Sequence, residues 1–356
     1  MIKQVTLLLL FFAVSSQISA AQDWENPAEQ YRDAYKAYLL ATCPIPADNI
    51  QHFVYFSKDR KKIINHAFLA NAQFQGAQIM YSWKELEPRK GRYDFSMVEK
   101  DLNYLKKHGK KLFVQLQDVT FYPKYKAVPN YLLSDVYDGG VVAQYYADGQ
   151  PGGWVAKRWS EKVRVEFARF LQAFGEAFDG KIEGINLQET AIEIGEDPGD
   201  GFTEEKYVAG LKANMLALKK AFPTSTTMQY ANFVPGEWLP WDDKGYLSSI
   251  YAYGQEIGVG LGAPDLMVQR KAQLNHPLRF MHEGDYSVPI GIAIQDGNYA
   301  GQTGADLDYS EQSDKARNNI VPLLHAFAKD FLKVNYIFWV NQPPYFEEDV
   351  LTCFVD

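Results

Sequence analysis

Cysteine is scarce in this sequence, and its scarcity narrows the chemistry open to the protein. The 356 residues include only two cysteines, Cys43 and Cys353, near opposite ends of the chain. No histidine accompanies either one closely, so the pattern does not indicate a cysteine nucleophile activated by histidine. In an oxidising compartment such a pair is more often bridged than free, and we expect a Cys43–Cys353 disulfide that joins the two ends.

Long runs of positive charge are also missing. The formal net charge is -8, and the densest basic cluster is KDRKK at 58–62. Nucleic acids and anionic membranes need broader cationic surfaces, so this composition favours a neutral or mildly charged ligand and no nucleic acid. After the first residues, no uncharged apolar stretch approaches the length needed to cross a bilayer, and we expect no membrane insertion. The sequence does not determine the oligomeric state.

The first residues have the pattern of an export signal. Lys3 precedes the apolar run VTLLLLFFAV at 5–14, and small residues follow in SSQISAA. This order is typical of a secretory signal peptide, with cleavage after Ala20 or Ala21. We therefore predict a signal peptide at 1–21, an N-terminal extension at 22–50, and a protein that is secreted or periplasmic.

Short apolar runs alternate with helical patterns over the rest of the chain. Eight strand-like segments start near 52, 77, 111, 181, 226, 259, 289 and 335. Eight such units over roughly 300 residues predict an α/β fold of the (β/α)8 TIM-barrel type. No linker rich in Gly, Ser or Pro interrupts 51–356, which predicts a single domain. The long segment 118–160 is rich in aromatics, Gly and Pro, and we expect a functional loop on the C-terminal face of the barrel.

Polar and aromatic residues stand at or just beyond the predicted strand ends. These candidate binding residues are Trp83, Gln115, Gln117, Gln188, Tyr230, Asn232, Asp265, Gln295, Asn298, Trp339 and Asn341. Aromatic faces stack on sugar rings, while amides and carboxylates hydrogen-bond hydroxyl groups, so the set favours a carbohydrate ligand. His276 and His282 lie six residues apart rather than four, and no metal or cofactor motif is present, so we expect neither.

The segment GAQIMYSWKELEPRKGRYDFSMVEKDL, at 76–102, carries a more specific pattern. Trp83 is followed by Glu87-Pro88, then Gly91, then Tyr93-Asp94-Phe95 before a predicted helix. This resembles the second-strand region of clan A glycoside hydrolases, especially the β-galactosidase-like members. The resemblance implies hydrolysis of O-glycosyl bonds with a Glu at the end of the fourth strand as acid/base. Glu189, directly after Gln188 in IEGINLQETAIE, holds that place.

The predicted seventh strand departs from the family pattern. The family has a nucleophilic Glu there, whereas PIGIAIQDGNYAG at 289–301 offers Gln295 and Asp296. We predict Glu189 and Asp296 as the catalytic pair, with Asp265 as a reserve general base. Retaining enzymes hold their carboxyl groups roughly 5–5.5 Å apart and inverting ones roughly 6.5–9.5 Å apart, and the sequence selects neither scheme.

Two other functions fit parts of the sequence. The missing seventh-strand Glu is compatible with a catalytically silent barrel that binds polysaccharide in the cell envelope. A carbohydrate lyase would need a catalytic base, such as Tyr230. It would also need a residue that neutralises the carboxylate of a uronic acid, such as Arg158. The sugar, the linkage and internal or terminal attack are not predicted by any motif.

Overall fold

The computed structural model describes residues 29–146, 148–195, 198–199, 201–237, 242–295, 297–299 and 314–355, with side chains in the last range described from 320 onward. The predicted signal peptide and Asp296 lie outside the described residues. Among the described residues, no helix is both long and apolar enough to pass through a membrane.

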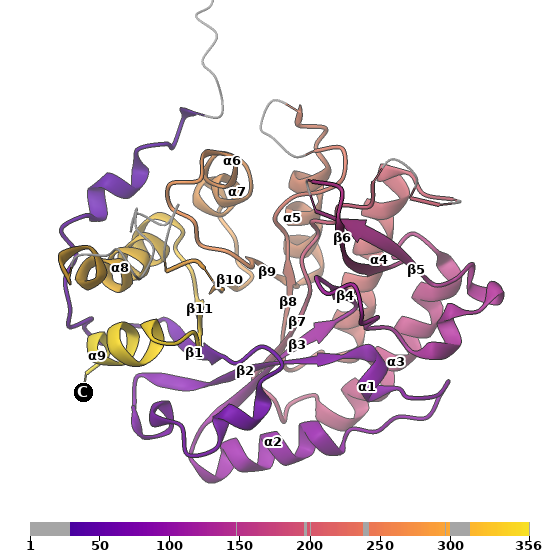
Figure 1. The fold of residues 1–356 in the computed structure, drawn as a ribbon, viewed down its shortest axis with the longest axis horizontal. Helices are drawn as coiled ribbons and strands as arrows, with labels where there is room; N and C mark the ends of the chain where they lie inside the picture. Colours follow the sequence, from indigo (N-terminus) through magenta and orange to yellow (C-terminus); the bar gives the residue numbers. More distant parts are fainter. Residues whose placement is uncertain are drawn as a thin grey trace, which may run out of the picture.

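Eight parallel strands close into a barrel, which confirms the predicted fold (Figure 1). Each strand coincides with a segment expected from the sequence. In chain order they are β1 (Gln51–Tyr55), β2 (Phe74–Ser82), β3 (Lys111–Gln117), β7 (Gly184–Leu187), β8 (Thr226–Tyr230), β9 (Gly260–Ala263), β10 (Ile290–Ile294) and β11 (Tyr336–Val340). β11 pairs with β1, and this pairing closes the circle.

Helices surround the barrel, as Figure 1 shows. The longer ones are α2 (Ser96–Lys107), α3 (Glu161–Phe178), α4 (Glu204–Ala221), α5 (Tyr246–Ile257), α7 (Pro277–Glu283) and α8 (Asp314–Ala326), and the short ones are α1 (Trp83–Leu86), α6 (Lys271–Leu274) and α9 (Leu351–Cys353). Single turns are η2 (Ala34–Tyr38), η3 (Arg60–Ile63), η4 (Ala67–Ala70), η5 (Asn130–Leu133) and η6 (Asp135–Tyr137), with wider π turns at η9 (Phe327–Phe331) and η10 (Phe346–Val350).

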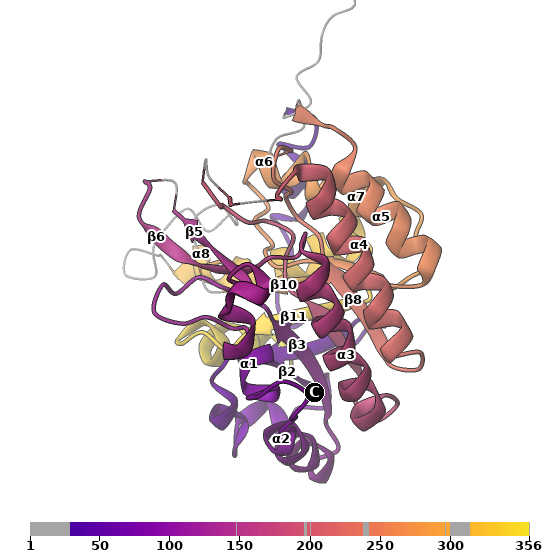
Figure 2. The same ribbon diagram turned by 90° about the vertical axis from the view of Figure 1, so that its right-hand side faces the viewer.

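The long segment between β3 and β7 folds into a small antiparallel sheet. Its strands are β4 (Val119–Thr120), β5 (Val141–Tyr145) and β6 (Pro151–Ala156), in the order β4-β6-β5. In Figure 2 the β5–β6 hairpin projects on the side of the barrel strands away from α3, α4 and α5. β4 follows β3 after a single residue, so this sheet stands at the C-terminal ends of the barrel strands, where barrel enzymes carry their sites.

The barrel interior changes from aromatic to polar along its axis. Phe53, Phe113 and Phe338 pack together with ring centroids 4.9–5.9 Å apart, and Phe113 meets the other two edge to face. Gly184 leaves room for this packing, because a Cβ there would lie 2.6 Å from the ring of Phe113. Nearer the C-terminal ends, the buried Gln78 donates from Nε2 to Asn186 Oδ1 (3.0 Å) and to the Tyr230 hydroxyl (2.9 Å). The interior therefore becomes hydrophilic below the mouth of the barrel.

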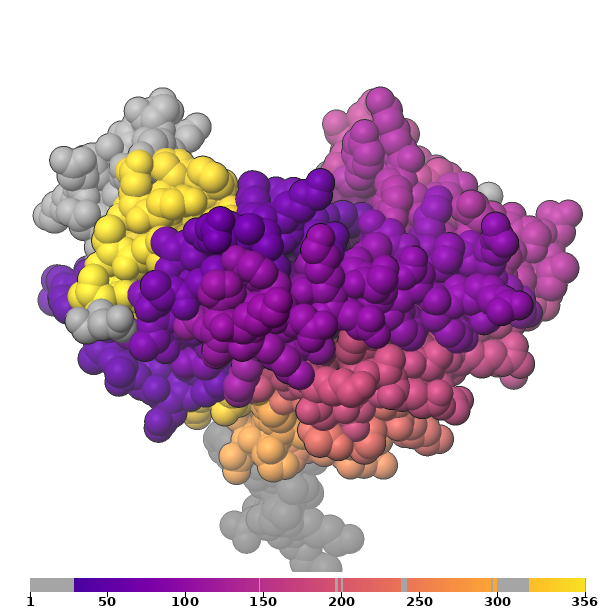
Figure 3. All heavy atoms as spheres, turned by 90° about the horizontal axis from the view of Figure 1, so that it is seen from below, coloured from indigo at the N-terminus to yellow at the C-terminus, as the bar shows by residue number. Residues whose placement is uncertain are grey.

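The segment around Cys43 lies beside the C-terminal residues. Cys43 and Cys353 form the expected disulfide, with their Cα atoms 4.9 Å apart, and the Ile45 amide donates to the Cys353 carbonyl over 2.8 Å. In Figure 3 the yellow C-terminal residues lie directly beside the indigo N-terminal segment. The bridge closes a loop of 310 residues, so in chain-entropy terms it restricts nearly the whole unfolded chain.

Candidate active site

Glu189 follows β7 and lies in the wall of a cavity at the barrel mouth. Asn232, just beyond the next strand β8, donates from Nδ2 to Glu189 Oε2 over 2.7 Å. Burial, together with the negative charge of Asp265, raises the pKa of the Glu189 carboxyl to about 7. The Asn232 hydrogen bond acts in the opposite direction, because it stabilises the ionised form. Glu189 is therefore substantially protonated at neutral pH.

Asp265 is the second carboxyl group in the same cavity. It follows β9, and Asn298 donates from Nδ2 to Asp265 Oδ1 over 3.1 Å. The side-chain oxygen of Asn298 in turn accepts from the backbone amides of Leu266 (3.2 Å) and Gln295 (2.9 Å). These two bonds fix the orientation of the Asn298 side chain. Burial raises the pKa of Asp265, while the Asn298 bond and the positive charge of Arg270 lower it. Each carboxyl group is thus held by one asparagine from a neighbouring strand end.

A buried arginine supports the backbone that carries Glu189. Arg158 Nη1 donates to the Glu189 carbonyl over 2.7 Å and to the Tyr207 hydroxyl over 2.9 Å. The same guanidinium binds both carboxylate oxygens of Asp118, at 2.8 and 2.7 Å. Tyr207 continues the chain by donating to the Thr190 carbonyl over 2.9 Å. Because these groups are buried and mutually paired, they constrain the peptide on both sides of Glu189.

Gln188 is turned toward the adjacent loop. Its Oε1 accepts from the amides of Asp118 (3.1 Å) and Val119 (2.9 Å), where β3 passes into β4. Its carbonyl accepts from Gln229 Nε2 over 2.7 Å. Gln188 therefore fastens three strand ends together, and it also lines a cavity.

Glu189 lines two cavities. The hairpin hollow, of about 300 Å³, is lined by residues that include Phe121, Gln144, Tyr145, Tyr146, Glu189, Asn232, Asp265, Arg270 and Gln273. The strand-end hollow, of about 560 Å³, is lined by residues that include Tyr55, Lys58, Gln115, Gln117, Phe121, Tyr122, Tyr125, Gln188, Glu189, Tyr230 and Gln295. Both volumes suit a small-molecule ligand.

Most of the predicted residues that the structure describes line these hollows. Asn298 does not line them but holds Asp265, and three others, Trp83, Trp339 and Asn341, lie elsewhere. Trp83 is buried outside the barrel, where it packs on Phe167 and donates from its indole nitrogen to Glu87 over 2.7 Å. Trp339 is also fully buried, and Asn341 pairs with His66 at 3.2 Å. Neither hollow is lined by these three residues, so the prediction that Trp83, Trp339 and Asn341 bind the ligand is corrected here.

Several cleft residues were not picked out individually from the sequence. Tyr122, Tyr145 and Tyr146 belong to the aromatic segment 118–160, so its composition was their signal. Arg270 and Gln273 come from the loop and short helix after β9. No pattern in that stretch distinguishes them from ordinary surface residues.

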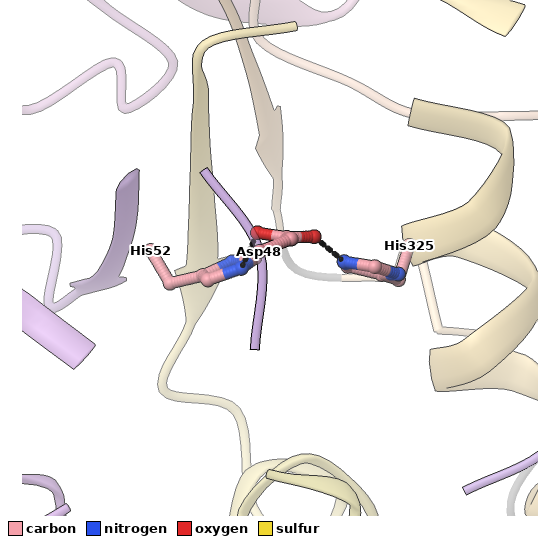
Figure 4. Close-up of side chains that lie close together, drawn as sticks. All are labelled: Asp48, His52 and His325. Atoms are coloured by element: carbon pink, nitrogen blue, oxygen red, sulfur yellow. Dashed lines mark hydrogen bonds and ion pairs between the residues drawn. The ribbon is translucent and has the colours of Figure 1, made fainter. Parts of the chain in front are cut away.

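Among the described residues, one group has the composition of a metal site. Asp48 lies between His52 and His325, with its oxygens 3.5 and 2.8 Å from their Nε2 atoms (Figure 4). However, the Trp339 indole N–H donates to His52 Nδ1 over 3.2 Å. A neutral His52 that accepts at Nδ1 carries its proton on Nε2, which leaves no lone pair there for a metal. These contacts fit a hydrogen-bonded His–Asp–His chain better than a metal centre.

The fold of this protein is similar to that of several solved structures. No protein-family model matches the sequence, and no curated protein matches it. The structure is similar to GH5_18 from Streptomyces cattleya in complex with GlcNAc, with 12% identity, TM-score 0.53, and coverage of 83% of this chain and 71% of that one. It is also similar to endo-glycoceramidase II from Rhodococcus sp. (13% identity, TM-score 0.52, 85% and 76% coverage). A family 39 glycoside hydrolase from Bacteroides cellulosilyticus WH2 aligns at 14% identity and TM-score 0.51, over 83% and 57% of the chains.

Proposed function

We propose that this protein is a glycoside hydrolase that cleaves a neutral or mildly charged oligo- or polysaccharide by carboxylate acid/base chemistry. The observation that carries the proposal is the pairing of Glu189 with Asp265 in one aromatic-lined cavity at the barrel mouth. A glycosidase needs one carboxyl group protonated and another ionised at the same pH, and burial with mutual repulsion separates their pKa values in this way. The solved structures of similar fold include glycoside hydrolases, so the barrel is compatible with this chemistry.

Glu189 is the proposed general acid. With a pKa of about 7, a large fraction of Glu189 is protonated at neutral pH, and this form donates its proton to the glycosidic oxygen as the bond breaks. Asn232 then stabilises the carboxylate that forms, because its N–H already points at Oε2. The Arg158 contact with the Glu189 carbonyl keeps the peptide in position through this change of charge.

The other carboxylate acts on the opposite side of the sugar, either as nucleophile or as base for water. Asp265 is supported by its place in the same cavity and by its effect on the pKa of Glu189. Asp296, which the sequence predicts for this role, lies outside the described residues and stays a prediction. Proton NMR of the first-formed sugar anomer distinguishes retention from inversion.

The two alternatives are less well supported. A silent binder needs no pair of facing carboxyl groups, yet Glu189 and Asp265 line one cavity. A lyase would need Tyr230 and Arg158 free to act, but Tyr230 accepts from Gln78 inside the barrel and Arg158 is paired with Asp118. Export follows from the predicted signal peptide and agrees with the Cys43–Cys353 disulfide.

The test is hydrolysis by wild type and Glu189→Gln on a panel of neutral and uronic-acid polysaccharides. Glutamine keeps the shape of the side chain but has no acidic proton to transfer to the leaving group. We expect the variant to lose hydrolysis by a factor on the order of a hundred or more, while its affinity for the polysaccharide stays close to that of wild type. Near-wild-type hydrolysis by the variant would show that Glu189 is not the acid.

A further inference from the structure

The two hollows share two lining residues, Glu189 and Phe121. Glu189 and Phe121 therefore stand between the two hollows and border both of them. We propose that the hollows are the two arms of one binding cleft, and that the enzyme cleaves polysaccharide chains internally, with sugar units bound on both sides of Glu189. This inference rests on the proposed glycosidase function and specifies the substrate as the interior of a polymer.

Two glutamines that line the strand-end hollow have side-chain carbonyl oxygens without a hydrogen-bond partner among the described residues. Gln115 and Gln117 lie two residues apart on β3, so their side chains point to the same face. They are only 2% and 6% exposed, and their carbonyl oxygens accept no hydrogen bond within the described residues. A buried carbonyl oxygen without a hydrogen-bond donor is costly, so a ligand that supplies a donor there would be favoured. Sugar hydroxyl groups, which both donate and accept, match this pair.

The hairpin hollow has an aromatic wall instead. Tyr145 and Tyr146 at the end of β5 are 39% and 49% exposed, and Phe121, which borders both hollows, is 52% exposed. Exposed aromatic rings gathered at a cavity indicate a binding surface for a ligand with apolar faces, such as a sugar ring. The wall is fixed in place, because the Tyr145 amide donates to the Glu193 carbonyl over 2.7 Å. That contact joins the hairpin to the loop that carries Glu189.

The two arms differ in chemistry but carry ligand-binding features on either side of the proposed acid. An enzyme that removes terminal units needs a cleft that ends just beyond the scissile bond. Here one hollow lies on each side of Glu189, with the buried amides in one and the tyrosines in the other. A chain bound across both arms presents an interior bond to Glu189.

The experiment compares viscosity with bond cleavage. Wild-type protein is incubated with the neutral and uronic-acid polysaccharides of the panel, and solution viscosity, new reducing ends and product sizes are followed together. We expect viscosity to fall by about half while only a small fraction of bonds is broken, with oligosaccharides of mixed length as early products. Release of one short product at nearly constant viscosity would overturn internal cleavage yet leave the glycosidase proposal intact. Absence of any hydrolysis would instead overturn the proposed function and this inference with it.

Variants in each arm test whether both arms bind the chain. Tyr146→Ala removes a ring from the hairpin hollow, and Gln117→Leu removes an amide from the strand-end hollow. In the Glu189→Gln background, each should weaken binding of the cleaved polysaccharide roughly two- to tenfold. Leu40→Ala is the control, since Leu40 is exposed and lines neither hollow. Thermal unfolding checks that each variant is folded. If only one of the two variants weakened binding, the proposal that the chain spans both hollows would be contradicted.

Discussion

The side-chain amide of Asn232 donates to Oε2 of Glu189 over 2.7 Å, and this bond favours the ionised carboxylate against the burial that disfavours it. The pKa of Glu189 is therefore a balance between these opposing effects. Because the residues come from the ends of adjacent strands β7 and β8, the barrel itself sets their spacing. The pH dependence of activity should report this balance directly.

Asn232→Ala removes the bond that stabilises ionised Glu189, so the pKa of Glu189 should rise. An acid catalyst must be protonated, and the alkaline limb of the kcat profile should therefore move to higher pH. We also expect kcat to fall on the order of tenfold, because the carboxyl group loses its orientation. The measurement is kcat from pH 5 to 9. An unchanged alkaline limb would mean that another group sets it.

Asp265→Asn removes the neighbouring negative charge that raises the pKa of Glu189. The alkaline limb should then move to lower pH, opposite to the Asn232 variant. If Asp265 is also the second catalytic carboxylate, kcat should fall on the order of a hundredfold or more. Asp296→Asn is the matched comparison. A larger loss for Asp296→Asn than for Asp265→Asn would assign that role to Asp296.

Arg158→Met should destabilise the fold, because it leaves the Asp118 carboxylate buried without its partner. Breaking a buried ion pair in this way costs about 3–5 kcal/mol. Denaturant unfolding measures the loss. The double variant Arg158→Met with Asp118→Leu should recover part of it, since no buried charge then remains. If the single and double variants were equally unstable, the unpaired charge would not be the cause.

The His–Asp–His chain should lower the free energy of unfolding as the pH falls. Burial holds the pKa of His52 below its usual 6.5. This histidine therefore binds a proton more tightly in the unfolded chain than in the folded one. The stability that its neutral form contributes is present above about pH 6.5 and is lost as the pH falls below that value. Hydrogen bonds from His325 and His52 outweigh burial and lower the pKa of Asp48, so its contribution is lost only under more acidic conditions, below its unfolded pKa. Urea unfolding at pH 7.5 and 5.5 measures the His52 effect.

The variant His52→Gln should flatten the change in unfolding free energy between pH 7.5 and 5.5. Zinc added to wild type should give no stabilisation that depends on His52, because its Nε2 carries the proton. An increase in melting temperature with zinc that His52→Gln abolishes would show that the cluster binds metal after all.

The sequence predicted the barrel because eight apolar runs recur with helical patterns between them. This alternation of strands and helices along the chain is a strong signal. The orientation of Trp339 was not predictable in this way. Both faces of a barrel strand are buried, so an apolar run does not reveal which side chains point inward. In the structure Phe338 faces the interior and Trp339 meets His52 on the other face.

The proposed acid and the supporting network were predictable to different degrees. Glu189 and Asp265 stand at strand ends, where a barrel gathers polar groups, so their cavity could be expected. Arg158 and Arg270 come from irregular connections whose path depends on tertiary packing. The small β4–β6–β5 sheet was likewise hidden in a segment that showed only its aromatic composition.

The most direct test of the account is the leaving-group dependence of Glu189→Gln. An aryl glycoside with an acidic phenol needs no proton on departure, whereas a sugar leaving group does. The variant should therefore cleave the activated aryl glycoside of the substrate's sugar at close to the wild-type rate of bond cleavage, and lose on the order of a hundredfold or more on the unactivated glycosidic bond. Equal losses on both substrates, or no loss on either, would contradict the assignment of Glu189 as the general acid.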